Sequence, residues 1–243
     1  MELIKYCKEE HNPLLLGTTL QLGTGKYYRN MDPSFGIADP EEGFVNYRND
    51  ELGIDAFGNV GQNCYMFCVS TTNMTQEEAR ERLNSEYNSR YYIQDSFHLA
   101  VVLSYAIKDQ LTLDDIDPES MRGLTADDLK DVMVACFRDK VSYRDDPYEL
   151  ETAKVQAPEF TLGDTMFSFW SYLRANFTKR KKYAHDTEYR FYFVIVHRSN
   201  MILSVKEDSK RVTFSKREIE KALSKNRRDT AGIENKWGYT RRT

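Results

Sequence analysis

The sequence lacks the features that divide a chain into separate domains. Its 243 residues contain 6 prolines and 12 glycines, and no Pro/Gly/Ser-rich linker or low-complexity tract interrupts them. No segment repeats at a fixed period, which argues against solenoids and propellers. A chain of this length buries a sizeable core. We therefore expect one domain over residues 1–243.

Long apolar runs are also absent. The N-terminal residues M-E-L-I-K-Y-C-K-E-E lack the basic and apolar parts of a secretory signal, and no run has the length of a membrane span. These two absences predict a cytoplasmic protein that has no membrane partner.

Cysteine is scarce, and the few thiols are too scattered for a disulfide scaffold. The four are Cys7, Cys64, Cys68 and Cys136. Cys64 and Cys68 fall on one face of an expected strand, so a zinc site is an alternative to buried thiols. The nearest histidine in sequence, His98, is distant from both, and we predict no metal.

Acidic residues are relatively few in the C-terminal quarter of the chain, where basic residues are concentrated. The net charge is -4, but Lys179 to Thr243 holds 18 Lys/Arg against 8 Asp/Glu, and the first 178 residues hold 16 against 30. A basic C-terminal quarter can attract RNA or DNA. A solvated surface and a dock for an acidic partner protein are the alternatives. The candidate nucleic-acid contacts are Lys179, Arg180, Arg227 and Arg228.

Hydrophobic patterns predict an α+β fold with a mixed or antiparallel sheet. Apolar alternation and short apolar runs indicate strands, and capping-box spacings indicate helix starts. The expected strands are 3–7, 19–23, 43–47, 52–57, 64–70, 140–143, 189–197, 201–205 and 211–214. The expected helices are a short one within 9–17, then 75–83, 95–109, 125–138 and 215–225, and 167–177 fits either element.

These elements suggest a βαβ-like opening, a helical insertion at about 75–138 and a basic tail at about 226–243. The segment from Thr24 to Gly61 is rich in Gly, Asp, Asn and Pro. Long irregular segments of this kind are often functional loops, and we expect this one to cover a ligand.

Three places carry side chains suited to chemistry. The first strand with its following Y-Y-R turn offers aromatic and basic groups, and Ser70-Thr71-Thr72 ends a buried strand. The third is Glu188, which heads the apolar strand E-Y-R-F-Y-F-V-I-V. Arg190 lies on the same face two residues later, where it would keep Glu188 ionised or bind a phosphate.

Each place also has a plain structural interpretation. Glu188 and Arg190 can form an ordinary ion pair at a strand end. Thr72 or Asn73 can cap the helix that follows. The tyrosines can be core residues.

The order of an aromatic or basic residue, a hydroxyl and a glutamate resembles the ADP-ribosyltransferase superfamily. There a first-strand Arg, His or Tyr and a second-motif Ser or Tyr position the nicotinamide and ribose of NAD, and a third-motif Glu completes the site. The resemblance implies a split sheet, with Ser70 and Glu188 as catalytic residues. The NAD contacts that it implies are Tyr6, Tyr28, Arg29, Thr71 and Arg190.

A second resemblance covers both ends of the chain. The sequence is similar to an uncharacterised family of bacterial, phage-defence-associated proteins with the motifs K-Y-C, L-x-L-G-T-x-x-Y-Y-R, D-P-E-E-G and K-x-x-K-Y-x-x-x-x-E-Y-R-F. The matching segments are Lys5 to Cys7, Leu20 to Arg29, Asp39 to Gly43 and Lys179 to Phe191. The middle of the chain carries none of these motifs.

Several common enzyme motifs are missing. The block G-T-G-K-Y-Y-R-N has neither P-loop nor Rossmann spacing, and the sequence contains no H-E-x-x-H and no G-x-S-x-G. A zinc protease and a serine hydrolase are therefore disfavoured. Asp39, Glu41 and Glu42 fit a metal-dependent nuclease only weakly, because D-P-E-E-G is typical of a turn.

The leading hypothesis is an NAD-dependent ADP-ribosyltransferase-like toxin or antiphage effector. Loss of nicotinamide leaves positive charge on the ribose, and a nearby carboxylate such as Glu188 would stabilise that charge or take a proton. The acceptor would be nucleic acid or protein, and a neutralising antitoxin or partner protein is a further expectation. The alternative is a non-catalytic nucleotide- or partner-binding module of a bacterial defence or phage accessory system.

Overall fold

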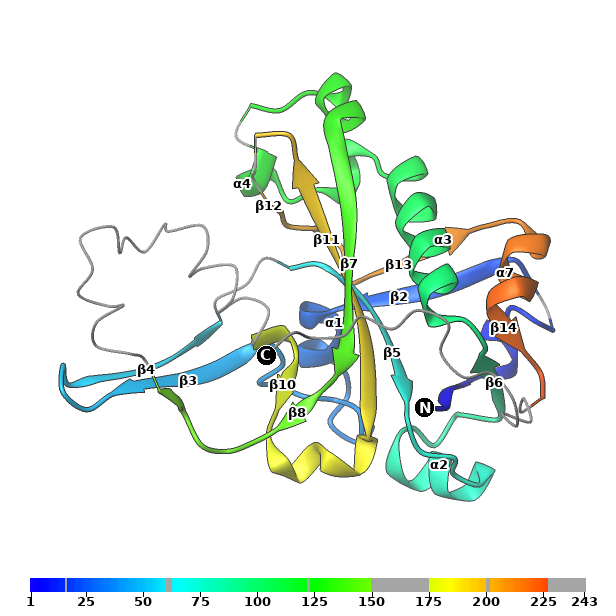
Figure 1. Cartoon of the computed structure of the whole chain (residues 1–243), viewed down its shortest axis with the longest axis horizontal. Coiled ribbons are helices and arrows are strands. Elements are labelled where there is room, and N and C mark those ends of the chain that lie inside the picture. The colour runs from blue at the N-terminus through cyan, green and yellow to red at the C-terminus, as the bar shows by residue number, and fades with distance from the viewer. Residues whose placement is uncertain (16, 60–62, 122, 150–174, 200–201, 227–243) are drawn as a thin grey trace, which may run out of the picture.

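A nine-stranded antiparallel sheet forms the centre of the computed structural model (Figure 1). The structure describes residues 1–15, 17–59, 63–121, 123–149, 175–199 and 202–226. The strands of this sheet are β1 (Leu3–Cys7), β2 (Thr19–Thr24), β5 (Tyr65–Ser70), β6 (Ser89–Ile93), β7 (Val132–Lys140), β11 (Glu188–His197), β12 (Ile202–Leu203), β13 (Ser209–Thr213) and β14 (Leu223–Ser224). The expected α+β class and its antiparallel sheet are confirmed.

The sheet divides at β5. One edge of this strand pairs with β11 from Tyr65 to Ser70. On the other edge, β2 pairs only with Tyr65 and Met66, and β1 pairs only with Ser70. β2 pairs on its other edge with β13, whereas β1 pairs with β6, and β6 pairs with β14. The β2–β13 pair and the β1–β6–β14 group therefore leave the middle of β5 unpaired on this edge.

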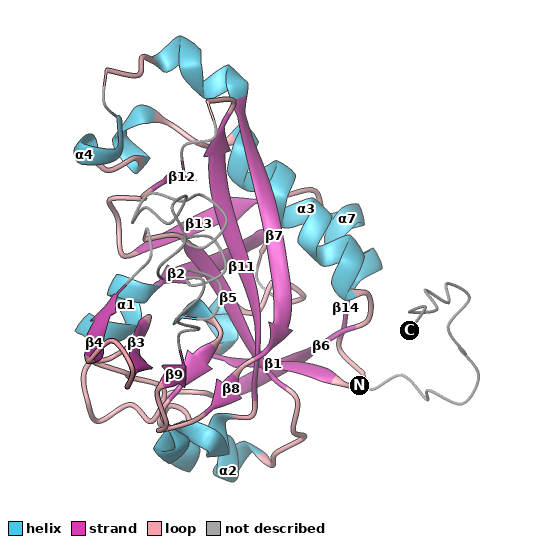
Figure 2. Ribbon diagram, turned by 60° about the vertical axis from the view of Figure 1, so that its left-hand side comes forward, coloured by secondary structure: helices cyan, strands magenta, loops and turns pink. Residues whose placement is uncertain are grey.

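Two smaller sheets and several short helices surround the main sheet (Figure 2). The smaller sheets contain β3 (Phe44–Asn49), β4 (Ile54–Asn59) and β9 (Tyr148–Glu149), and β8 (Ser142–Tyr143) with β10 (Thr178–Lys179). The α-helices are α1 (Gly25–Asn30), α2 (Gln76–Arg82), α3 (Ser96–Asp109), α4 (Pro118–Met121) and α7 (Lys216–Ala222). The 3₁₀ helices are η1 (Glu9–His11), η2 (Leu113–Asp115), η3 (Ala126–Asp131) and η4 (Lys181–Asp186).

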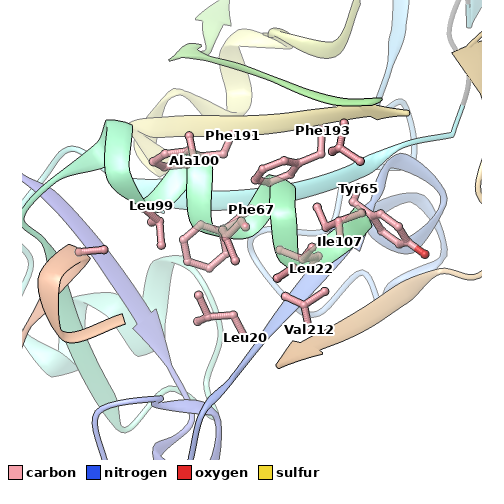
Figure 3. Close-up of a cluster of buried hydrophobic side chains, with 14 of the residues drawn as sticks. Leu20, Leu22, Tyr65, Phe67, Leu99, Ala100, Ile107, Phe191, Phe193 and Val212 are labelled. Atoms are coloured by element: carbon pink, nitrogen blue, oxygen red, sulfur yellow. The ribbon is translucent and has the colours of Figure 1, made fainter. Parts of the chain in front are cut away.

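The main core lies between the sheet and α3. Figure 3 shows Leu99 and Ile107 of this helix with Phe67, Phe191 and Phe193 of the central strands, and these residues belong to one buried cluster. Alternation along β11 sends the intervening residues to the opposite face. That second face carries Glu188 and Arg190 as well as apolar side chains.

Helix starts were the most predictable local features. Thr75 and Glu78 form the expected capping box of α2, and the Ser215 side chain accepts the backbone N–H of Glu218 at the start of α7. The alternative caps Thr72 and Asn73 are wrong, because Thr75 occupies that position. These motifs act within four residues, so the sequence specifies them locally.

The expected helix over 125–138 is wrong. The box of Thr125 and Asp128 is present, but it starts only η3, and the chain then becomes β7. The run V-M-V-A-C-F pairs with β11 along the whole of β7. With β6, this strand makes the expected insertion at 75–138 only partly helical, because long-range pairing overrides the local signal.

The opening of the chain also differs from the expected βαβ-like unit. Among the described residues of 9–17, only Glu9–His11 form a helix, the short η1, and β1 and β2 pair with different parts of β5. Most of 167–177 and nearly all of the expected tail lie outside the described residues. None of the helices in the described ranges has the length and apolar character needed to cross a bilayer.

Gly36 joins the loop that carries Ile37 and Asp39 to the end of α2. A Cβ at this position would overlap the backbone carbonyl of Arg82, and the neighbouring Ile37 N–H donates to Leu83 O at 3.2 Å. We expect Gly36→Ala to lower the free energy of unfolding by about 1–3 kcal/mol, because backbone must shift. Chemical denaturation measures this loss.

Gly17→Ala is the matched control for Gly36→Ala. The closest atom to a Cβ at Gly17 is 3.9 Å away, which is an ordinary contact distance. Equal stability changes in the two variants would contradict the close approach at Gly36.

Candidate functional site

The candidate site lies where β1, β5 and β11 meet. Glu188 at the start of β11 pairs with Ser70 at the end of β5, and Ser70 also pairs with Ile4 of β1. A cavity of about 50 Å³ opens beside them, and we call it the carboxylate cavity. Its polar walls include Lys5, Tyr6, Ser70, Lys179, Asp186 and Glu188.

Arg190 is the centre of a buried charge cluster. Its Nε donates to Glu188 Oε1 at 2.7 Å, and its Nη1 donates to Glu42 Oε1 at 2.6 Å. The same guanidinium donates to the backbone carbonyl of Asn176. The Arg190 side chain is 0% exposed and is not among the residues that line the carboxylate cavity. It therefore organises carboxylates and does not face a ligand directly.

Lys179 is the second cation of the cluster. Its Nζ lies 2.9 Å from Glu188 Oε2, 3.1 Å from Asp186 Oδ2 and 3.8 Å from Glu42 Oε2. Its side chain is only 2% exposed. Lys179 is thus an ion-pair partner of these carboxylates rather than a surface cation.

These cations control the ionisation of Glu188. Burial alone would raise the pKa of its carboxyl, but Arg190 and Lys179 outweigh burial and hold that pKa far below its usual range. Glu188 is therefore a permanent carboxylate on the cavity wall. This agrees with the role expected for Arg190 as a group that keeps Glu188 charged.

The pKa values of Asp39 and Asp186 are shifted in the opposite direction, upward. Burial and the nearby Glu42 raise the pKa of Asp39 to about 6. Burial raises the pKa of Asp186 against the attraction of Lys179. The cluster holds four buried acids and two cations, so it carries excess negative charge when all are ionised. Burial is the main cause of both raised pKa values, and repulsion from Glu42 at Asp39 and from Glu188 at Asp186 adds to it.

The hydroxyl residues at the end of β5 join the turn before β11. Ser70 Oγ lies 2.9 Å from Thr187 Oγ1 and accepts the Thr72 N–H at 3.1 Å. Thr71 Oγ1 donates to Thr187 O at 2.9 Å. Thr187 adopts a left-handed conformation with φ 45°, which is unusual for a β-branched residue. Ser70 reaches the cavity, whereas Thr71 is not among its lining residues.

Of the aromatic and basic residues of the first motif, the two tyrosines Tyr6 and Tyr28 line the carboxylate cavity, whereas Arg29 does not. The Tyr6 hydroxyl accepts the Met74 N–H at 2.6 Å, and Tyr6 lines the carboxylate cavity. Tyr28 is buried on α1 and also lines the cavity. Arg29 instead donates to Glu42 O at 2.7 Å, so it supports the loop that carries Glu42.

Besides the buried Lys179, the proposed nucleic-acid contacts were Arg180, Arg227 and Arg228. Arg180 Nε lies 2.7 Å from Glu41 Oε2, and its guanidinium lies over the Phe57 ring. Arg227 and Arg228 lie outside the described residues. Among the described residues, no group of three His, Cys, Asp or Glu side chains could hold a metal ion.

Glu42 and Asp186 are the site residues that sequence reasoning did not place. Glu42 lies in D-P-E-E-G and reaches Arg190 across 148 positions of sequence. Its signals in the sequence were the occurrence of that motif together with E-Y-R-F in the second resemblance and its weak fit, with Asp39 and Glu41, to a metal-dependent nuclease. Asp186 carried no motif, and its role depends on η4 folding back toward Lys179.

Removing the central cation should destabilise the fold. Arg190→Met leaves Glu42 and Glu188 buried with Lys179 as their one remaining cation in the cluster, and we expect a loss of about 3–5 kcal/mol in the free energy of unfolding. Urea denaturation measures it. Arg198→Met is the control, because Arg198 is 70% exposed in its pair with Asp131 and should change stability by under about 1 kcal/mol. Similar losses in both variants would contradict the central role of Arg190.

The raised pKa of Asp39 predicts a pH-dependent stability difference. Its pKa of about 6 in the folded state exceeds the 3.8 of an ordinary aspartate, so the folded state binds more protons between these values. Asp39 therefore lowers wild-type stability as pH rises through this window. Relative to wild type, Asp39→Asn should gain about 2 kcal/mol between pH 4 and pH 6. A constant difference from pH 4 to pH 6 would refute the buried titration.

Comparisons with other proteins give no independent guide to this site. No family model, no curated protein and no solved structure matches the chain. The chemistry must therefore be inferred from the arrangement itself, in which an ionised Glu188 and a less acidic Asp186 share one cavity wall with Ser70.

Proposed function

We propose that the protein transfers ADP-ribose from NAD to a macromolecule. The observation that carries this proposal is the permanently ionised Glu188 on the wall of the carboxylate cavity. Excess buried negative charge favours a cationic ligand group. Both the pyridinium of NAD and the ribose cation formed during its cleavage carry that charge.

The reaction divides into two bond changes. The bond between the ribose carbon and the nicotinamide nitrogen breaks, and its electron pair leaves with nicotinamide. The acceptor nucleophile then bonds to the cationic ribose carbon and loses a proton. Glu188 stabilises the cation as it develops, because a fixed carboxylate needs no reorganisation at that moment.

Proton transfer falls to a different residue from the one that the sequence suggested. A carboxylate with the depressed pKa of Glu188 is a weak base. Asp186 lines the same cavity and has a raised pKa, so it is better suited to accept the proton of the nucleophile. Ser70 lies opposite Glu188 on β5 and can position the substrate ribose through its hydroxyl.

The divided sheet supports an ADP-ribosyltransferase-like fold within this proposal. The resemblance implied a split sheet, and β1 and β2 separate on one edge of β5 next to the site. Nucleic acid and protein both remain acceptors for the proposed transfer, and a neutralising partner protein belongs to the same proposal.

The pairing of Glu188 supports a second function. Both of its oxygens contact cations, Arg190 at 2.7 Å and Lys179 at 2.9 Å, as in a purely structural cluster. In this alternative the protein binds a nucleotide or a partner in a bacterial defence or phage accessory system, without catalysis. NAD would then remain intact.

A substitution of Glu188 distinguishes ADP-ribose transfer from binding without catalysis. Glu188→Gln keeps the shape of the side chain and removes the charge, so nicotinamide release from NAD should fall by roughly two to three orders of magnitude. Incubation with labelled NAD and cell lysate measures both nicotinamide release and transfer of label. Thermal unfolding must show that the variant remains folded.

Glu220→Gln serves as the matched control, since Glu220 is exposed and pairs only loosely with Lys216 at 3.8 Å. It should retain wild-type activity. If the wild type neither releases nicotinamide nor transfers label, or if Glu188→Gln matches the wild type, the transferase function is excluded.

A further inference from the structure

A second cavity of about 230 Å³ adjoins the carboxylate cavity. We call it the split crevice, because residues of β1, β2 and β5 line it where the sheet divides. The two cavities share five wall residues: Lys5, Tyr6, Tyr28, Ile37 and Tyr87. A ligand longer than one ring can therefore extend from Glu188 into the crevice.

Lys5 stands at the junction of the two cavities. Its Nζ donates to Cys68 O at 2.7 Å and lies 5.0 Å from the centre of the Phe67 ring. The bonded carbonyl belongs to the part of β5 that pairs with neither β1 nor β2. An ammonium has three N–H donors, and this is its one hydrogen bond to the described residues. Lys5 thus retains donors for a ligand.

The two cavities differ in the charge of their walls. Lys5 and Lys179 balance Asp186 and Glu188 in the carboxylate cavity. In the crevice, Lys5 and Lys8 outnumber the one acid, Glu86, which pairs with Lys8 at 2.6 Å. Burial lowers the pKa of His11, another residue of the crevice wall, which favours its neutral form near pH 7. The crevice is therefore the more positive of the two cavities and favours an anionic group.

The crevice is also rich in flat aromatic surface. Its tyrosines are Tyr6, Tyr27, Tyr28, Tyr87 and Tyr91. Tyr27 and Tyr28 pack edge to face with ring centres 5.3 Å apart, and a Cβ on Gly23 would come within 2.9 Å of the Tyr27 ring. This close packing fixes the wall, and aromatic rings suit the stacking of a nucleobase.

We propose that the split crevice binds the adenosine phosphate part of the substrate, with Lys5 contacting the phosphates at the junction. This inference rests on the proposed function and adds to it the orientation of the dinucleotide, whose cationic ring meets the carboxylates. It also assigns phosphate binding to Lys5 and Lys8. Arg29 and Arg190, the arginines expected from the sequence, are bonded to Glu42 and lie in neither cavity wall.

Isothermal titration calorimetry of the full chain with ADP-ribose, AMP and adenosine tests the assignment. ADP-ribose lacks nicotinamide, so its binding does not depend on transfer. Lys5→Met should weaken ADP-ribose and AMP by about tenfold or more, because a charged hydrogen bond is lost. Adenosine has no phosphate, and its affinity should stay within about twofold.

Two further variants keep the test independent of folding. Lys5→Arg retains a cation that can bond Cys68 O, and it should bind AMP within about threefold of wild type. Lys26→Met removes a lysine that pairs with Asp208 and lies outside both walls, so it should bind like wild type. Thermal unfolding of each variant identifies any loss caused by misfolding.

The outcomes separate this inference from the proposed function. No AMP or ADP-ribose binding to the wild type overturns the crevice assignment, and equal AMP binding to folded Lys5→Met overturns the role of Lys5. If Lys5→Met weakened the binding of adenosine as much as that of AMP, Lys5 would not recognise the phosphate, and its proposed role would again be overturned. Tight ADP-ribose binding without any nicotinamide release supports the crevice and contradicts only the transfer reaction.

Discussion

Arg190 lies completely buried between Glu42 and Glu188, and the surrounding chain must fold so that this charge is neutralised. An unpaired guanidinium in a protein interior is strongly destabilising. The loop carrying Glu42 must therefore dock against β11, and Asn176 must present its carbonyl. One cation thus connects three distant segments and fixes Glu188 at the cavity wall.

Lys179 extends the same constraint to the turn before β11. It contacts Asp186 and Glu188 together, and the turn between them contains the left-handed Thr187. Thr187 also bonds to Ser70 and Thr71 at the end of β5. The hydroxyl and carboxylate groups are therefore held by one network, in which a change at one residue affects the position of the others.

The division of the sheet at β5 creates the second cavity of the site, the split crevice. A continuous pairing along β5 would fill the edge that now borders the crevice, and the Cys68 carbonyl would bond to a backbone amide instead of Lys5. Separation of β1 and β2 thus accounts both for the space and for the cation inside it. Asp186 and Glu188 line only the carboxylate cavity, whereas Lys8 lines only the crevice and Lys5 lines both. The crevice is therefore the more positive part, which suits the phosphates of a dinucleotide whose cationic ring meets the carboxylates.

The sequence by itself determined the local features: the apolar run of β11, the caps at Thr75 and Ser215, and the shared face of Glu188 and Arg190. Two-residue periodicity and short-range hydrogen bonds suffice for these. Only tertiary structure decided that 132–140 is a strand, that Glu42 meets Arg190, and that Lys179 is buried while Lys5 faces the cavities. Strand pairing and the pKa of a buried group depend on partners far away in the chain, which no local pattern identifies.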